Sequence, residues 1–327
     1  MTNENLTIDD IARELGVSKT TVSRSISGKG RISETTRRRV LDFIEMNNYK
    51  PNLMARGLAQ SRTYNIGWVV PGDSEMTALS FFQQCMLGVI DVATQADYDL
   101  LITTIFDHNI GGLLRVLDNQ KVDGVILGQT LTQDPAIRAL KKSGISFVTV
   151  GSTDEKNVVQ VDHDHRNACR ELASILKLKG IRSSVLIAGA ENKVVTQARR
   201  RGFEEGMDGV NTTIYMNCER TEEIEQAVED ALRSKTDCIV CEDDRICYIV
   251  LGKLRRDGVP IPSGVRVASF YHSSLIEDSQ PAITSLLYDP KALGATACRT
   301  LLAMIAGETT EPRQLLGYEV MLKASTL

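Results

Sequence analysis

The sequence predicts an α/β protein made of two unequal parts, a small all-α head at the N-terminus and a larger α/β body. Two observations lead to this prediction. Residues 6–48 contain three helical patterns joined by short turns. From residue 65 onward, short apolar runs alternate with longer amphipathic segments, which is the pattern of parallel α/β units. The length of 327 residues exceeds what one average domain needs and agrees with this division.

Charge is divided unevenly between the two parts. The whole chain has a formal net charge of −4, from 38 Lys and Arg against 42 Asp and Glu. Residues 1–62 contain 11 Lys and Arg against 7 Asp and Glu, a net charge of +4, which leaves −8 for the remainder. Because phosphate binding needs only a local positive surface, a basic head on an acidic body is compatible with a nucleic-acid partner.

Composition and segment lengths exclude several other classes of protein. The start, MTNENLTIDD, lacks a basic segment followed by an apolar one, and no apolar run approaches the roughly 20 residues of a membrane-spanning helix. Seven cysteines, an odd number scattered through the chain, favour reduced thiols in a cytoplasmic protein. Cys238 and Cys241 have metal or redox spacing, but no second pair accompanies them, so we expect packed side chains in an apolar strand.

The first two helices of the head fit a helix-turn-helix. A capping-box start at Thr7 opens the first helix, and Gly16 closes it. Ser18 then caps a second helix over Lys19–Ile26, whose inward side includes Val22. The turn between the two helices is only a few residues long, as a steep helix crossing requires.

The outward side of the second helix carries short hydroxyls and long cations: Lys19, Thr20, Thr21, Ser23 and Arg24. The N-terminus of such a helix can meet a phosphate, and its leading side chains can reach base edges in the major groove. A solvated surface helix is the alternative interpretation. The tight turn, the core pattern and the polar outer face coincide in this segment, which favours DNA binding.

A third helix and a linker complete the N-terminal part. The helix begins after Ser33 and is expected to bury Val40 and Leu41 together with residue 44. Residues 52–60 could form a helix of one or two turns, which is too short to be stable without a partner. An apolar Leu58 on this marginal helix could wedge into a DNA minor groove, and a flexible linker is the alternative.

The whole N-terminal segment resembles a known family. The matching stretches are Thr7–Arg24, Gly30–Ser33, Tyr49–Asn52 and Ala55–Leu58, which are similar to the head and hinge of LacI/GalR-type transcriptional repressors. The resemblance implies that Lys19 and Thr20 sit where the family varies its operator choice, and that Leu58 is its minor-groove wedge. The implied DNA contacts are Ser18, Lys19, Thr20, Thr21, Ser23, Arg24, Asn52 and Leu58.

Eight strands are expected in the body: Ile66–Val70, Asp99–Thr103, Gly124–Leu127, Phe147–Val150, Ser184–Ala188, Thr212–Met216, Asp237–Cys241 and Val265–Phe270. Ligands of such α/β units bind beyond the C-terminal ends of the strands. The nucleotide-binding motifs G-x-G-x-x-G and G-x-x-x-x-G-K-[ST] do not occur, and we expect no cofactor.

Six stretches of the body also resemble the effector domain of the same family, which is similar to the periplasmic sugar-binding fold: Ile66–Pro71, Val122–Leu127, Val161–Asp162, Arg199–Phe203, Pro281–Thr284 and Leu293–Gly294. The resemblance implies two α/β lobes that the chain connects by three crossings, with a small molecule bound between them. The predicted divisions are a head at 1–50, a hinge at 51–62 and a body at 63–327. Within the body we expect an N-lobe of about 63–162 plus 289–316 and a C-lobe of about 163–288 plus 317–327.

Six residues are candidates for the effector pocket by this resemblance: Phe81, Phe82, Asp162, Arg199, Asp243 and Tyr271. Either phenylalanine could stack on a sugar or a base, although core packing is at least as good an interpretation for one of them. A carboxylate that accepts from hydroxyls and a forked arginine suit a polyol or a carboxylate ligand. Asp243, Tyr271 and Tyr288 replace the usual Asn, Asp and Gln of the family, so the identity of the ligand stays open.

Enzyme and metal functions are disfavoured. The run Asp162–His165 contains His-x-His, which can chelate, but a third or fourth ligand at characteristic spacing is missing, so we expect no metal. The sequence has no G-x-S-x-G and no defensible Cys/His pair for nucleophilic catalysis, so we expect no enzyme.

The sequence therefore predicts a cytoplasmic transcriptional regulator, a repressor controlled by a small molecule, with a carbohydrate as the expected effector. A homodimer on a palindromic double-stranded operator is expected, because one recognition helix reads only a half-site. No membrane partner is expected. The alternatives are a family regulator controlled mainly by a partner protein, a ligand-binding protein of the periplasmic type, and an α/β enzyme with an accessory head.

Overall fold

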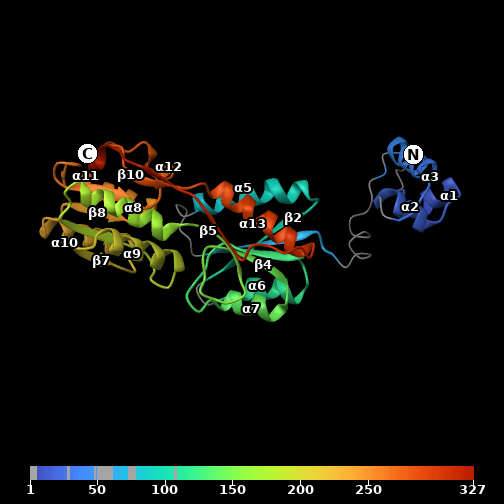
Figure 1. The fold of residues 1–327 in the computed structure, drawn as a ribbon, viewed down its shortest axis with the longest axis horizontal. Helices are drawn as coiled ribbons and strands as arrows, with labels where there is room; N and C mark the ends of the chain where they lie inside the picture. The colour runs from blue at the N-terminus through green and yellow to red at the C-terminus, as the bar shows by residue number, and fades with distance from the viewer. Residues whose placement is uncertain (1–5, 28–29, 48, 50–61, 73–78, 107–108) are drawn as a thin grey trace. The chain divides into compact units, whose positions relative to one another are not determined.

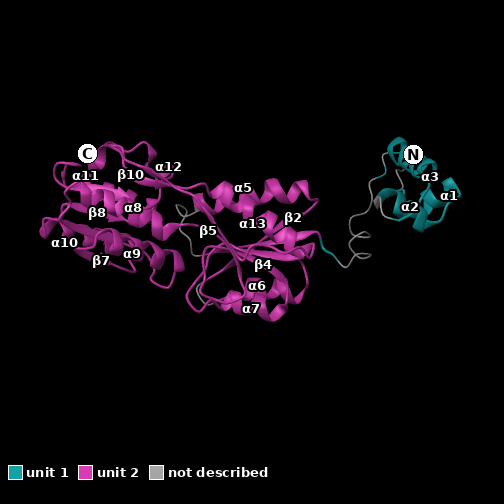
Figure 2. Ribbon diagram, in the orientation of Figure 1, with its two compact units in different colours: residues 1–63 teal, residues 64–327 magenta. Residues whose placement is uncertain are grey.

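The structure is a computed structural model that describes residues 6–27, 30–47, 49, 62–72, 79–106 and 109–327. The chain divides into two compact units, Met1–Thr63 and Tyr64–Leu327, hereafter the head and the body (Figure 2). Helices form the described part of the head, and two largely parallel sheets covered by helices form the body, so the predicted fold class is confirmed. No helix within the described ranges is long and apolar enough to cross a membrane.

The described part of the head contains α1 (Ile8–Leu15), α2 (Lys19–Ser27) and α3 (Glu34–Met46). The Thr7 hydroxyl accepts from the Asp10 N–H at 3.3 Å and the Asp10 carboxylate accepts from the Thr7 N–H at 3.0 Å, which confirms the capping box. Gly16 ends α1 with a φ of 62°, a conformation that glycine adopts without steric cost. The Ser18 hydroxyl accepts from the Thr21 N–H at 3.1 Å and caps α2, as predicted.

The three helices pack around a small apolar core that includes Ile11, Val22 and Val40. The prediction that Leu41 is buried beside Val40 is wrong, because Leu41 is 42% exposed. Neighbouring residues of an α-helix point about 100° apart, so Val40 and Leu41 cannot both face a core this small. Phe43 packs against the core from the same helix instead.

The first sheet of the body, the N-lobe sheet, has the strand order β11-β5-β4-β3-β1-β2, and every neighbouring pair is parallel. Its strands are β1 (Asn65–Pro71), β2 (Asp99–Ile105), β3 (Gly124–Leu127), β4 (Ser146–Val150), β5 (Val159–His163) and β11 (Arg313–Leu316). Its helices are α5 (Leu79–Gln95), α6 (Gly111–Asp118), α7 (Pro135–Ser143) and α13 (Pro290–Ile305). One core lies between the sheet and the pair α5 and α13, and another lies on the opposite face against α6 and α7 (Figure 1).

The second sheet, the C-lobe sheet, has the order β12-β10-β9-β8-β6-β7, and only the β10–β12 pair is antiparallel. Its strands are β6 (Ser183–Ile187), β7 (Asn211–Tyr215), β8 (Cys238–Cys241), β9 (Arg266–Ser269), β10 (Thr284–Leu287) and β12 (Glu319–Met321). Its helices are α8 (His165–Leu178), α9 (Val194–Gly206), α10 (Thr221–Arg233), α11 (Asp244–Arg256), α12 (Ser274–Glu277) and the short 3₁₀ helix η1 (Ala324–Thr326). Helices α8 and α9 cover one face of this sheet, and α10 and α11 cover the other.

The chain passes between the two sheets three times. The crossings follow β5, β10 and β11, since β5 and β11 belong to the N-lobe sheet while β6, β10 and β12 belong to the C-lobe sheet. All eight strands predicted from the sequence are present; Gly124–Leu127 has the predicted ends, and no end of the others differs by more than two residues. The four strands beside the crossings, β5, β10, β11 and β12, are not among the eight, because they are short and carry polar residues between their apolar ones.

Helices α5 and α13 pack backbone against backbone in the N-lobe. A Cβ atom built on Gly88 would lie 2.0 Å from the Lys291 carbonyl oxygen, and one built on Gly294 would lie 2.0 Å from the Cys85 carbonyl oxygen. Only glycine fits at both positions, so these two residues set the distance between the helices.

The seven cysteines are free thiols, and all of them are buried. Cys238 and Cys241 lie in β8 with 0% exposure. The sequence-based interpretation of this pair as packed side chains is therefore confirmed. Burial also raises the pKa of Cys238, to about 12, so this thiol is protonated at neutral pH.

Candidate functional site

The head exposes most of the predicted DNA-contacting side chains on one helix. Ser18, Lys19, Thr20, Ser23 and Arg24 are exposed, and Thr21 is half-buried. The inward side of α2 is apolar at Val22, which is fully buried. The sequence therefore builds α2 with one side against the head core and a polar, cationic side toward solvent. Asn52 and Leu58 lie outside the described residues.

Two contacts orient the polar residues around the turn between α1 and α2. The Lys19 ammonium forms an ion pair with the Asp9 carboxylate, and the Arg39 guanidinium donates to the Leu15 carbonyl oxygen. The Arg39 contact ties α3 to the end of α1. Both contacts are exposed, so a phosphate could compete for Lys19 at small energetic cost.

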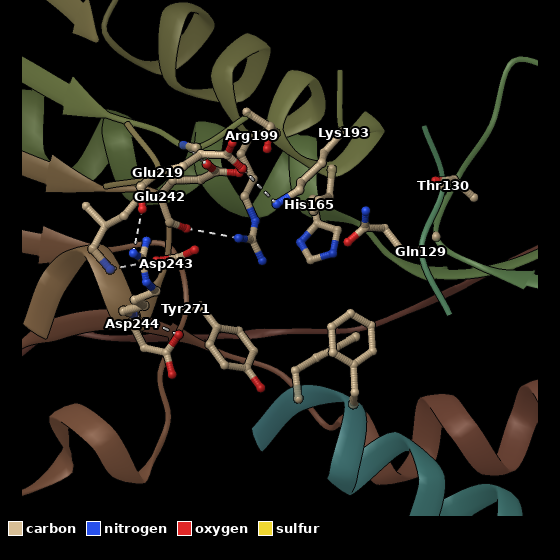
Figure 3. Close-up of a pocket in the computed structure, with 18 of the residues that line it drawn as sticks. Gln129, Thr130, His165, Lys193, Arg199, Glu219, Glu242, Asp243, Asp244 and Tyr271 are labelled. Carbon is tan, nitrogen blue, oxygen red and sulfur yellow. Dashed lines mark hydrogen bonds and ion pairs between the residues drawn. The ribbon is translucent and has the colours of Figure 1, made fainter. Parts of the chain in front are cut away.

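The body contains a cavity of about 460 Å³ between its two sheets. The six residues predicted for the effector pocket, Phe81, Phe82, Asp162, Arg199, Asp243 and Tyr271, all line this cavity. They come from both lobes. Asp243 and Tyr271 follow the carboxyl ends of β8 and β9, Asp162 lies near the end of β5, and the other three lie on α5 and α9. Figure 3 shows Arg199, His165 and Tyr271 directed toward a common space. The parallel topology thus gathers side chains far apart in the sequence into one cleft.

Aromatic rings form one side of the cavity. Phe81 and Phe82 meet edge to face with their centroids 5.3 Å apart, and Phe81 lies 6.1 Å from Tyr271. Phe81 belongs to α5 of the N-lobe but also packs against the core of the C-lobe. Phe81 therefore combines the two roles that the sequence left open, core packing and cavity lining. A flat apolar ligand face could rest on these rings.

The Asp162 carboxylate is occupied by neighbours of its own lobe and of α8. Its Oδ2 accepts from the N–H and the hydroxyl of Ser152, both at 2.8 Å, and its Oδ1 accepts from the His163 N–H at 2.8 Å. The His165 Nε2 lies 3.4 Å from the same Oδ1. Burial disfavours the charged form, but His165 and these hydrogen bonds outweigh burial and lower the pKa of Asp162 to about 2.

Arg199 is a buried cation at the centre of the cavity. Its Nη1 donates to the Glu242 carbonyl oxygen at 3.0 Å, and its Nε is buried without a hydrogen-bond partner among the described residues. The Glu242 side chain accepts from the Gly189 N–H at 2.6 Å, and burial raises its pKa. The hydrogen bond to the Glu242 carbonyl oxygen holds Arg199 in an orientation that leaves other guanidinium donors available to a ligand.

The N-terminus of α11 contributes two carboxylates to the lining of the cavity. Asp243 caps the helix, because its Oδ1 accepts from the Ile246 N–H at 2.8 Å. Asp244 is 5% exposed and accepts from the Ser273 hydroxyl. Burial, together with the neighbouring Asp243 charge, raises the pKa of Asp244 to about 6.

The two lobes are also joined by backbone hydrogen bonds at the mouth of the cavity. The Thr132 N–H donates to the Asn192 carbonyl oxygen at 2.8 Å, and the Val194 N–H donates to the Thr130 carbonyl oxygen at 3.2 Å. Leu131 and Lys193 form an isolated antiparallel bridge between the same loops. This interlobe bridge links the loop after β3 with the loop before α9 and holds the lobes close over the cavity.

Several residues of the cavity were not predicted as ligand contacts, notably His165, Glu242 and Thr196. The His-x-His motif points to His165 only as a metal ligand, and Glu242 precedes the predicted Asp243 by one position. A buried charged residue directly after an apolar strand is the signal that could have identified Glu242. Within the described ranges, no group of three or more His, Cys, Asp or Glu residues could hold a metal ion.

Comparison with known families gives two matches in separate parts of the chain. Residues 7–52 match the family described as "Bacterial regulatory proteins, lacI family". Residues 173–326 match the family described as "Periplasmic binding protein-like domain". The first match contains the three helices of the head, and the second contains most of the C-lobe together with α13 and β11.

Relatives align with the chain almost from end to end. Catabolite control protein A of Staphylococcus aureus (strain Mu50) is 27% identical over 98% of this chain and 99% of its own length. The protein of the same name from Priestia megaterium is 27% identical over 94% and 95%. A structure of the transcriptional regulator CelR with cellobiose is 26% identical, with a TM-score of 0.73 over 98% of this chain and 99% of CelR.

The same fold is present in the lac repressor dimer bound to operator and an anti-inducer. That structure is 20% identical and has a TM-score of 0.83 over 99% of this chain and 100% of the repressor. The order of the two matched families, the end-to-end relatives and the shared fold agree with the helix-turn-helix head and the cleft described above. The chain belongs to the lacI family of bacterial regulatory proteins and is a DNA-binding transcriptional regulator with an effector-binding domain.

Proposed function

We propose that this regulator is a repressor whose affinity for its operator is controlled by a carbohydrate bound in the cavity between the two lobes. The observation that carries the proposal is the cavity itself, which combines aromatic rings with hydrogen-bonding groups from both sheets. A ligand that contacts both lobes changes the free-energy difference between the open and the closed arrangement of the lobes. That change is the means by which the body can control the hinge.

The lining of the cavity supports a sugar as the effector. Phe82 and Tyr271 offer ring faces for the apolar side of a pyranose, while Arg199, Asp243 and Gln129 offer donors and acceptors for its hydroxyls. CelR was solved with cellobiose, and a structure named as a probable maltose operon transcriptional repressor covers 81% of this chain at a TM-score of 0.76. These relatives make cellobiose and maltose the first sugars to test.

On the DNA side, we assign direct operator contacts to the exposed residues of α2 and its cap, Ser18, Lys19, Thr20, Ser23 and Arg24. Thr21 joins them from a half-buried position. Asn52 and Leu58 are proposed to contact DNA from the hinge. We propose that Arg24 positions the head on phosphates, and that Lys19 and Thr20, at the start of α2, reach base edges and are the candidates for sequence choice.

A homodimer on a palindromic operator is part of the proposal. Large apolar side chains are exposed on α5 and on the adjacent edge strand β2, where Leu87 is 39%, Ile90 36% and Ile102 54% exposed. Contiguous exposed apolar groups are typical of protein interfaces. A second copy of this chain would cover them and would place two heads for two half-sites.

We also propose that the protein is not an enzyme. We propose that it acts in the cytoplasm, where an operator is found. The relatives are transcriptional regulators. The buried carboxylates of the cavity are engaged by hydrogen bonds to N–H or hydroxyl groups, such as those of Asp162 with Ser152 and of Asp244 with Ser273. Carboxylates engaged in this way are held in place by the protein.

The proposal is tested by finding the operator and then the effector with the full chain. Duplexes selected from random DNA should contain an inverted repeat, and their binding should weaken steeply with salt because phosphate contacts release counterions. Maltose, cellobiose, sugar phosphates and nucleobases are then screened for a rise in the melting temperature, since a cavity ligand stabilises the folded state by mass action.

A compound that stabilises the chain should also change operator affinity in a gel shift. Selected duplexes without a repeat would contradict the dimer. Stabilisation by a nucleobase but by no sugar would replace the carbohydrate with another effector class. Stabilisation by a sugar that leaves operator affinity unchanged would contradict control through the cavity.

A further inference from the structure

His165 lies in the wall of the cavity and has one polar atom without a partner in the described part of the chain. It is the first residue of α8, is 6% exposed and lines the cavity beside Arg199 (Figure 3). Its Nε2 lies 3.4 Å from Asp162 Oδ1. Its Nδ1 is buried and has no hydrogen-bond partner in the described part of the chain. One nitrogen of the ring therefore faces a carboxylate of the protein, and the other has no described partner.

The neighbouring carboxylate determines which nitrogen carries the proton. Asp162 is ionised at neutral pH and can only accept hydrogen bonds, so the His165 nitrogen that faces it must be Nε2–H. Burial lowers the pKa of His165, the Asp162 charge raises it and the Arg199 charge lowers it; the net direction is downward, so the ring is neutral at neutral pH. A neutral ring with Nε2–H has a bare lone pair on Nδ1. His165, a residue of the cavity wall, therefore carries a hydrogen-bond acceptor that no described protein group uses.

Arg199 supplies the complementary donor. Its Nε is buried without a partner among the described residues, and an arginine can only donate. The two side chains are close enough for the Arg199 charge to act on the His165 ring, yet no hydrogen bond joins them. A group that donates to His165 Nδ1 and accepts from Arg199 would satisfy both. A hydroxyl does this with a single oxygen atom.

Asp162, in contrast, has little capacity left for a ligand. Each of its oxygens already accepts from a backbone N–H at 2.8 Å, from Ser152 and from His163, and each faces a second protein donor. A ligand hydroxyl would have to displace one of these protein donors. The residue predicted from the sequence as a ligand clamp therefore holds the surrounding loop and the His165 ring.

We infer that His165 Nδ1 accepts a hydrogen bond from a hydroxyl of the effector whose oxygen accepts from Arg199, and that Asp162 is a positioning residue that acts through His165. The inference rests on the proposed function, because it names the group that reads a hydroxyl of the proposed carbohydrate. Between His165 and Arg199 the effector must therefore carry a hydroxyl that both donates and accepts a hydrogen bond.

The first test needs no ligand. The full chain is labelled with ¹⁵N at its four histidines, and the imidazole resonances are assigned by His→Phe variants. At about pH 7 His165 should be neutral, with its proton on Nε2. A proton on Nδ1, or on both nitrogens, would overturn the inference, because His165 would then offer no acceptor to the cavity.

The second test adds maltose or cellobiose to wild-type and variant chains. His165→Phe keeps a ring of similar size but removes Nδ1, and should weaken binding of the sugar at least about tenfold. His163→Phe is the matched control. His163 is buried two residues away, with its ring 4.8 Å from Tyr288, but it does not line the cavity. His163→Phe should bind the sugar as the wild type does.

A rescue variant separates loss of the acceptor from loss of structure. His165→Asn places an amide oxygen near the position of Nδ1 and should bind the sugar more tightly than His165→Phe. Equal affinities for His165→Phe and wild type would overturn the inference, and so would equal losses in His165→Phe and His163→Phe. If neither sugar binds the wild type, the carbohydrate proposal fails, while the proton position still decides whether His165 is an acceptor.

Discussion

Replacing one buried carboxylate should stabilise the body at neutral pH. Asp244 lies at the start of α11, is 5% exposed, and has its pKa raised to about 6 by burial and by the Asp243 charge. Asn fits the same site. Its amide oxygen can accept from the Arg245 N–H as Asp244 Oδ1 does, and its amide nitrogen can donate to the Ser273 hydroxyl.

The magnitude follows from the difference between the folded and unfolded pKa values. Between an ordinary value of 3.8 and about 6, the folded chain keeps a proton on Asp244 that the unfolded chain has lost. The free energy of unfolding of the wild type therefore falls as the pH rises through this interval, by roughly 3 kcal/mol at about 1.4 kcal/mol per pKa unit. Asp244→Asn lacks this loss, so it should be more stable than the wild type above about pH 6 and equal to it near pH 4.

Urea unfolding at about pH 4 and about pH 8 measures the difference. The single tryptophan, Trp68, is buried in the body, so its fluorescence follows the body rather than the head. Asp118→Asn removes an exposed carboxylate of the same unit and controls for the change in net charge. A stability difference between Asp244→Asn and wild type that does not depend on pH, or a variant less stable than wild type at pH 8, would refute the reasoning.

Four further changes have expected outcomes. Arg24→Ala should weaken operator binding at least about tenfold in a gel shift, because it removes an exposed cation of α2, and should leave the melting of the body unchanged. Arg199→Ala should abolish the effector response but spare operator binding, whereas the exposed Arg201→Ala should affect neither. Gly294→Ala should lower the free energy of unfolding by about 3 kcal/mol, since its Cβ would overlap a carbonyl oxygen of α5. Thr132→Pro removes the N–H donor of the interlobe bridge and should weaken effector binding about tenfold by calorimetry; unchanged affinity would show that the bridge does not support the closed lobes.

The architecture could be predicted from the sequence because local patterns determine it. The Thr7 capping box, the Gly16 turn and the Ser18 cap are each set by residues within a few positions of one another, and all three are present. The central strands of both sheets are continuous apolar runs, such as Gly124–Leu127, which is buried at every position. Patterns of this kind do not depend on the rest of the chain.

The roles of individual cavity residues depend on long-range contacts and could not be predicted in the same way. The six pocket candidates line one cavity, but that list did not reveal that Asp162 is occupied by Ser152 and His165. The partners of Arg199 and Glu242 become visible only when two strands of the C-lobe sheet are aligned. The prediction for Leu41 is wrong for a related reason: which face of α3 is buried depends on how the three helices of the head cross.

The glycine contact between α5 and α13 has a mechanical consequence. Helix α5 contributes Phe82 to the cavity at one end and exposes Leu87 and Ile90 on its outer side. Because Gly88 and Gly294 bring the two backbones into contact, α5 cannot tilt or slide without moving α13. A displacement imposed on Phe82 in the cavity is therefore expected to move both helices and, with them, the outer apolar surface. Occupancy of the cavity and the geometry of a dimer built on that surface would then change together.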